Sequence, residues 1–152
     1  MQERLNLLGA IAAHVIFISS IITFSSRLIF KISTGHWIGI PILLMIFPLI
    51  YLLVKAPGSD RPLIYFIQIG LMLVWLIVLF LVDYVIRFDF RQTQWMVISY
   101  VMLYFAGAGG MIGIASLAGR AWTISSIILF LITAILAFVQ RAELASNQRT
   151  GD

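Results

Sequence analysis

The fold is decided by residues 63–86, which read LIYFIQIGLMLVWLIVLFLVDYVI. Asp83 is the only charged residue in this stretch, which as a helix is long enough to cross the roughly 30 Å hydrocarbon core of a bilayer. A membrane-spanning β-strand would alternate apolar and polar residues, whereas residues 71–82 are apolar throughout. Because lipid offers no hydrogen bonds to exposed backbone groups, the sequence predicts a transmembrane helix here.

Four similar stretches extend this prediction to the whole chain. Hydrophobic residues make up 62% of the sequence and charged residues 11%, far from the composition of a soluble domain. We therefore predict an all-α, polytopic integral membrane protein: a compact bundle of five transmembrane helices, with four helices as the alternative. A single domain covers residues 1–152 and ends in a polar tail at 140–152. The expected spans are residues 7–30, 38–54, 63–86, 95–117 and 122–139.

Proline and glycine mark the expected breaks in these spans. Pro41 is tolerated in the first turn of the second span, but Pro48 lies inside it and predicts a kink. Residues 118–121 join the last two spans by a very tight turn, in which Gly119 is suited to cap the preceding helix.

The ten Lys and Arg residues are scattered among the helix ends, so we interpret them as topology and headgroup anchors and expect no nucleic-acid partner. Five spans place the termini on opposite sides of the membrane. By the positive-inside rule, six basic residues on one side against four on the other favour an N-out, C-in orientation. We expect the membrane to be a bacterial or archaeal cytoplasmic membrane. The outer set is Arg4, Lys55, Arg61 and Arg120, and the inner set is Arg27, Lys31, Arg87, Arg91, Arg141 and Arg149.

A cluster of small residues in the fourth span is the sharpest local feature. Gly109 and Gly113 form a GxxxG pair, and Ala106 and Gly110 form a second small pair beside it. Small side chains let a neighbouring helix approach closely, so these four residues predict a helix-packing face. An unwound segment that lines an ion or substrate site is the alternative.

The first and last spans carry small polar residues at helical spacing. Their hydroxyl groups can bond to the carbonyl four residues earlier, so these faces predict interior packing rather than a pore. The two faces consist of Ala12, Ile16, Ser19, Thr23 and Arg27, and of Thr123, Ser126, Thr133, Ala137 and Gln140.

Four polar residues inside the spans are candidates for function, because ionisable groups are costly in a bilayer. Arg27 and Asp83 lie at similar depth, which allows an ion pair. His14 and Gln68 share the opposite leaflet, which allows a hydrogen bond between them or a proton-sensitive site. For His14 we favour a hydrogen-bonded interhelical histidine over a proton relay or ligand site. Outside the spans, Arg87 and Arg91 are candidates to contact lipid headgroups.

Enzymatic and metal sites have little support in the sequence. The chain has no cysteine, and its two histidines, His14 and His36, flank the first span at opposite ends. We therefore expect no metal, haem or other cofactor. Serines of the first and last spans could pair with His14, but no nucleophile-elbow motif exposes one. An enzymatic activity is therefore not expected.

Three functional hypotheses remain. The first is a non-enzymatic membrane protein that acts through helix packing, as a subunit or assembly partner of a membrane complex. The second is a small transporter or channel that works as a homo-oligomer. The third is a lipid-binding or lipid-modifying protein that uses Arg87 and Arg91. The expected partners are accordingly the lipid bilayer and other membrane subunits or further copies of this chain.

Overall fold

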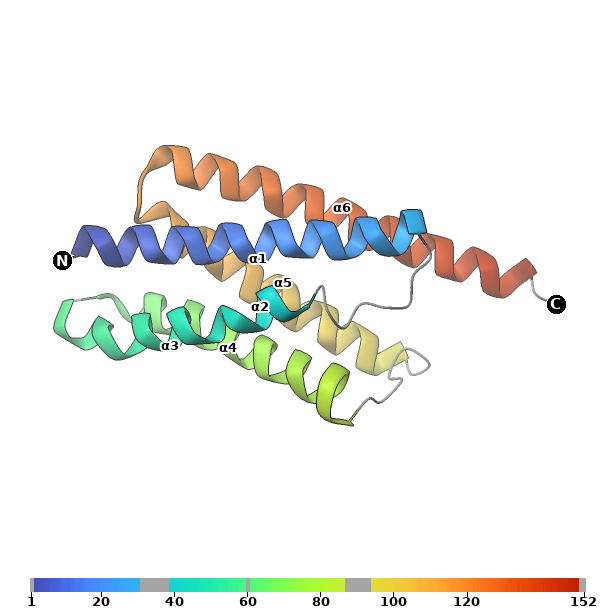
Figure 1. The fold of residues 1–152 in the computed structure, drawn as a ribbon, viewed down its shortest axis with the longest axis horizontal. Helices are drawn as coiled ribbons and strands as arrows, with labels where there is room; N and C mark the ends of the chain where they lie inside the picture. Colours follow the sequence, from blue (N-terminus) through green and yellow to red (C-terminus); the bar gives the residue numbers. More distant parts are fainter. Residues whose placement is uncertain (1, 31–38, 60, 87–93, 151–152) are drawn as a thin grey trace.

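A computed structural model describes residues 2–30, 39–59, 61–86 and 94–150 of the chain, and these residues form an all-α bundle (Figure 1). The described part contains no strand. Its helices are α1 (Gln2–Phe30), α2 (Ile40–Leu44), α3 (Ile46–Lys55), the 3-10 helix η1 (Ala56–Ser59), α4 (Leu63–Phe80), the π-helix η2 (Leu81–Ile86), α5 (Gln94–Ser116) and α6 (Arg120–Thr150).

Five segments of the described chain are long and apolar enough to cross a membrane, which confirms the predicted five-helix architecture. They lie close to the expected spans, and α6 continues as a helix to Thr150 through the segment assigned to a polar tail. The five segments are Gln2–Ile29, Ile40–Gly58, Leu63–Phe80, Ile98–Ser116 and Arg120–Gln140.

Successive spans run in opposite directions, so α1, α4 and α6 point one way (Figure 1). α5 packs against α1, α4 and α6, while α1 also packs against α2 and α3. At 1.5 Å per residue α1 is about 43 Å long, which exceeds the roughly 30 Å core of a bilayer. Its ends therefore reach the level of the lipid headgroups.

Pro48 divides the second span, as its position predicts. α2 ends at Leu44 and α3 begins at Ile46, with Met45 between them. Proline at position 48 has no N–H to donate to the Leu44 carbonyl, and its ring crowds that carbonyl. The interruption therefore falls one turn before the proline.

Gly119 makes the turn between α5 and α6 possible. Its φ is +124°, a conformation that side-chain-bearing residues rarely adopt. The amide of Gly119 donates to the Ser116 carbonyl, and its own carbonyl accepts from the amide of Thr123 in the first turn of α6. The prediction that Gly119 ends the fourth span is confirmed.

The bundle interior combines large apolar side chains with small hydroxyl groups. Ser126 and Thr133 of α6 are fully buried, whereas Ile128 and Ile135 of the same helix face outward. The Thr133 hydroxyl donates to the Leu129 carbonyl of its own helix, as expected for a hydroxyl in a packed face. An apolar outer surface over a partly polar interior suits a bundle surrounded by lipid. The largest fully buried apolar side chains are Phe17, Ile16, Leu49, Leu52, Ile69, Met72, Leu76, Met111 and Ile114.

Candidate functional site

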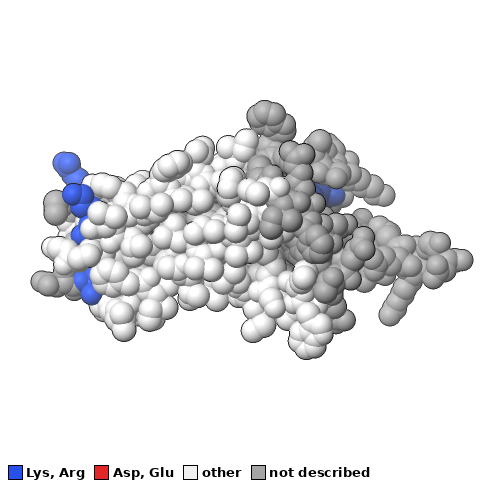
Figure 2. Space-filling model, turned by 90° about the horizontal axis from the view of Figure 1, so that it is seen from below, with Lys and Arg blue, Asp and Glu red and all other residues white. Residues whose placement is uncertain are grey.

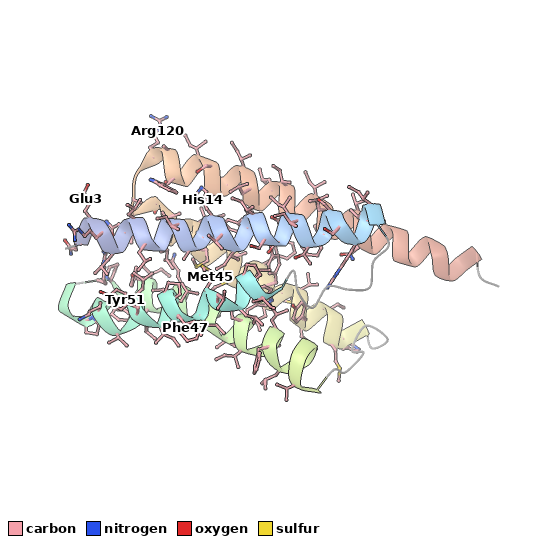
Figure 3. The ribbon with its side chains drawn as sticks, viewed as in Figure 1. Glu3, His14, Met45, Phe47, Tyr51 and Arg120 are labelled. Atoms are coloured by element: carbon pink, nitrogen blue, oxygen red, sulfur yellow. The ribbon has the colours of Figure 1, made fainter. Side chains whose placement is uncertain are left out.

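His14 is hydrogen-bonded between the first and last spans. It points from α1 toward α6 (Figure 3), where its Nε2 lies 2.7 Å from the Ser125 hydroxyl oxygen. Its Nδ1 lies 2.9 Å from the Ala10 carbonyl oxygen, one turn earlier in α1. The ring forms a T-shaped pair with the Trp122 indole, with ring centroids 4.8 Å apart and planes at 89°.

The Ala10 carbonyl fixes a proton on one nitrogen of the His14 ring. A carbonyl oxygen only accepts, so Nδ1 carries a proton and donates it to Ala10. In the neutral ring Nε2 then accepts from the Ser125 hydroxyl. The same hydroxyl oxygen also lies 2.9 Å from the Ala121 carbonyl and can donate there instead. Both ring nitrogens are therefore occupied by local partners, neither of which is Gln68.

Asn6 joins three helices near the beginning of α1. Its side-chain amide donates to the carbonyl of Leu117 after α5, at 2.8 Å. Its side-chain oxygen accepts from the guanidinium of Arg61, which precedes α4. Arg61 also lies over the ring of Tyr65, 5.0 Å from its centroid. The sequence interpretation missed this contact, although an amide directly before the first predicted span is a signal that could have revealed it.

A small open recess lies beside Asn6, at the end of the bundle where α1 begins. Its volume is about 210 Å³. Carboxylate, amide and indole side chains share the lining with leucine side chains. The lining residues are Glu3, Asn6, Leu7, Leu117, Ala118 and Trp122.

The glycines of α5 divide between two faces. A Cβ at Gly110 would lie 3.2 Å from the Gln68 backbone, and one at Gly113 would lie 2.2 Å from the Gln68 amide nitrogen. Ala106 and Gly109 are instead exposed, and a Cβ at Gly109 would have no neighbour within 4 Å. The four predicted packing residues are thus not one contact face within the chain: two of them meet α4 and two point outward.

Gly107, which the sequence interpretation left out, also packs tightly against α4. A Cβ at this position would lie 3.2 Å from the Cα of Met72. Gly107 and Gly110 therefore set the spacing between α4 and α5, one helical turn apart.

The remaining predicted polar residues are only partly described. Arg27 is half-buried in the last turn of α1. Asp83 lies in the π-turn η2, but its side chain lies outside the described part, so the Arg27–Asp83 ion pair stays a prediction. Arg87 and Arg91 also lie outside the described residues.

A buried aromatic cluster between α4 and α5 escaped the sequence interpretation. The rings of Trp75 and Tyr104 lie 5.0 Å apart, and Tyr100 adds a third ring 6.3 Å from Trp75. The Trp75 Nε1 is buried with no hydrogen-bond partner among the described residues, whereas the buried Tyr104 hydroxyl lies beside the hydroxyl groups of Ser20 and Thr133. Scattered aromatic residues in an apolar helix give no sequence signal that would have revealed this cluster.

Comparison with protein-family models, curated proteins and solved structures finds no match for this chain. Within the described residues, no group of three side chains could hold a metal ion. The functional assignment therefore rests on the contacts and surfaces of the chain itself.

Proposed function

We propose that this chain is a non-enzymatic integral membrane protein that acts through helix–helix contacts, as a subunit or assembly partner of a membrane complex. The observation that carries this proposal is a face of α5 whose residues are exposed on the described part of the bundle. We call it the α5 outer stripe, and it consists of Trp95, Ser99, Met102, Ala106, Gly109 and Ser116.

The α5 outer stripe has the composition and spacing of a helix-packing face. Its residues are exposed and recur at intervals of three, four and seven positions, which places them on one side of the helix. Ser99, Ala106, Gly109 and Ser116 are small, so a second helix could approach the backbone closely. Dispersion at such short range supports helix association in lipid, where the hydrophobic effect contributes little.

The environment of α6 supports the same proposal. Only 11% of the most apolar 18-residue stretch of α6 is buried inside the bundle, compared with 44% of the corresponding stretch of α1. α6 therefore packs by one face, which holds Ser126 and Thr133, and leaves a broad apolar surface for lipid or for another subunit.

The polar groups of the described spans also favour a packing role over a transport pathway. His14 is hydrogen-bonded to Ala10 and Ser125, and Asn6 to Leu117 and Arg61. Gln68 lies against glycines of α5 rather than beside His14. Apart from the bond from His14 to Ala10 within α1, these contacts join separate elements, as expected of groups that hold a bundle together.

The test is to identify what co-purifies with the full chain in mild detergent, after cross-linking in the membrane. We expect a discrete complex, with a second copy or another membrane protein, that Gly109→Leu weakens. Gly70→Leu is the matched control, because Gly70 of α4 also has nothing within 4 Å of an added Cβ but lies on another helix. A parent that remains monomeric without partners, or equal behaviour of both variants, would contradict the proposal.

We further propose the N-out, C-in orientation in a bacterial or archaeal cytoplasmic membrane. It is supported by the excess of basic residues in the set that holds Arg27 and Arg87. The test is to fuse, after Asp152, a reporter enzyme that works only in the cytoplasm. We expect the fusion to show reporter activity, and an inactive fusion would reverse the assigned orientation.

A further inference from the structure

The recess at the beginning of α1 lies where lipid headgroups would be. Because α1 is about 43 Å long, its first turns extend beyond a 30 Å hydrocarbon core. Glu3 and Asn6 stand in these turns, and Leu117 and Ala118 come from the α5–α6 turn at the same end. A ligand of this recess would therefore come from the membrane surface.

The lining of the recess favours a positively charged group. Glu3 supplies a carboxylate, and Trp122 supplies an aromatic ring, a side chain that cations also favour. We propose that this recess binds the ammonium group of an aminophospholipid, as found in phosphatidylethanolamine.

The surroundings of the recess suit the rest of such a lipid. Arg4 and Arg120 are exposed at this end of the bundle, and Figure 2 shows basic side chains gathered there. They can pair with the phosphate that follows the ammonium group. Leu7 and Leu117 line the recess and are partly exposed, so they offer apolar surface where the acyl chains begin.

The size of the recess also fits this ligand. At about 210 Å³ the recess is smaller than the pockets of roughly 300–1,000 Å³ that enclose drug-sized ligands, so it admits a small headgroup but not a whole lipid. The phosphate and acyl chains therefore remain outside, against the arginines and the apolar surface of the bundle.

The test is native mass spectrometry of the full chain, released from detergent micelles that contain equal amounts of phosphatidylethanolamine and phosphatidylglycerol. We expect the parent to retain phosphatidylethanolamine preferentially. Glu3→Gln should lower the ratio of the two retained lipids about threefold, the size of effect an exposed ion pair supports. Glu143→Gln removes the same charge in the distal part of α6 and should leave the ratio unchanged.

Two further measurements identify the source of the ammonium group and the role of its charge. Millimolar free ethanolamine should not displace the lipid, and full displacement would show that the recess takes a soluble amine instead. Glu3→Arg should shift retention toward phosphatidylglycerol. Preferential retention of phosphatidylglycerol by the parent, or equal ratios for Glu3→Gln and Glu143→Gln, would overturn the proposal.

Discussion

His14 and Ser125 are 111 residues apart in the sequence and are joined by a 2.7 Å contact between Nε2 and Oγ. The same separation recurs between Asn6 and Leu117, whose hydrogen bond lies at the end of the bundle where α1 begins. The first contact joins α1 to α6, and the second joins α1 to the turn between α5 and α6. Two polar contacts therefore hold the first span against sliding along the hairpin that α5 and α6 form.

The His14–Ser125 contact should contribute measurable coupling energy. Ser125→Ala removes the hydroxyl partner, and His14→Phe keeps a ring against Trp122 while removing the ring nitrogens. In a double-mutant cycle we expect a coupling of about 0.6 kcal/mol, with an upper bound of about 1.7 kcal/mol, as for other hydrogen bonds between membrane helices. Reversible unfolding in mixed micelles measures it. A coupling of zero would show that the contact contributes nothing to stability.

The two bonds of Asn6 can be separated by substitution. Asn6→Asp keeps an acceptor for Arg61 but removes the donor to the Leu117 carbonyl, whereas Asn6→Leu removes both. At about 1 kcal/mol for each hydrogen bond, we expect Asn6→Leu to lower the free energy of unfolding more than Asn6→Asp does. Thermal denaturation in detergent gives the order. A larger loss for Asn6→Asp than for Asn6→Leu would show that these two hydrogen bonds are not the main contribution of Asn6 to stability.

A larger side chain should change the free energy of unfolding differently on the two faces of α5. Gly107→Leu drives a side chain toward the backbone of Met72, so we expect the free energy of unfolding to fall by about 1–3 kcal/mol, as in other overpacked cores. Gly109→Leu projects into open space and should leave the stability of the monomer unchanged or raise it slightly, because leucine favours a helix over glycine. Unfolding of both variants in the same detergent is the measurement. Equal losses would contradict this assignment of faces.

The turn at Gly119 should not tolerate a side chain. Alanine at φ +124° is strained, so Gly119→Ala should cost about 1–3 kcal/mol of stability. Gly58→Ala provides the control, since a Cβ there meets nothing within 4 Å and the residue has no positive φ. The midpoint of thermal denaturation should fall only for Gly119→Ala. If both midpoints stay unchanged, the turn adapts without strain.

The spans and breaks of the fold could be predicted from sequence because they depend on local chemistry. Long apolar runs specify helices in lipid, Pro48 removes a backbone donor, and Gly119 permits a positive φ. Each of these effects acts within a few residues of its cause. The sequence therefore reports them without knowledge of the partner helix.

The faces and contacts could not be predicted because they depend on how the helices are rotated about their axes. α5 is apolar on every side, so its sequence does not distinguish the face of Gly107 and Gly110 from that of Gly109. Nor does it choose Ser125 rather than Gln68 as the partner of His14. Those choices follow from packing between residues far apart in the chain.

The tight turn at Gly119 has a consequence for how the chain enters a bilayer. Only Leu117, Ala118 and Gly119 separate α5 from α6, and Arg120 is the first charged residue after them. Two antiparallel helices joined so closely form a helical hairpin. A link of three residues reaches only about 10 Å, so α6 enters the bilayer from the same membrane surface at which α5 ends.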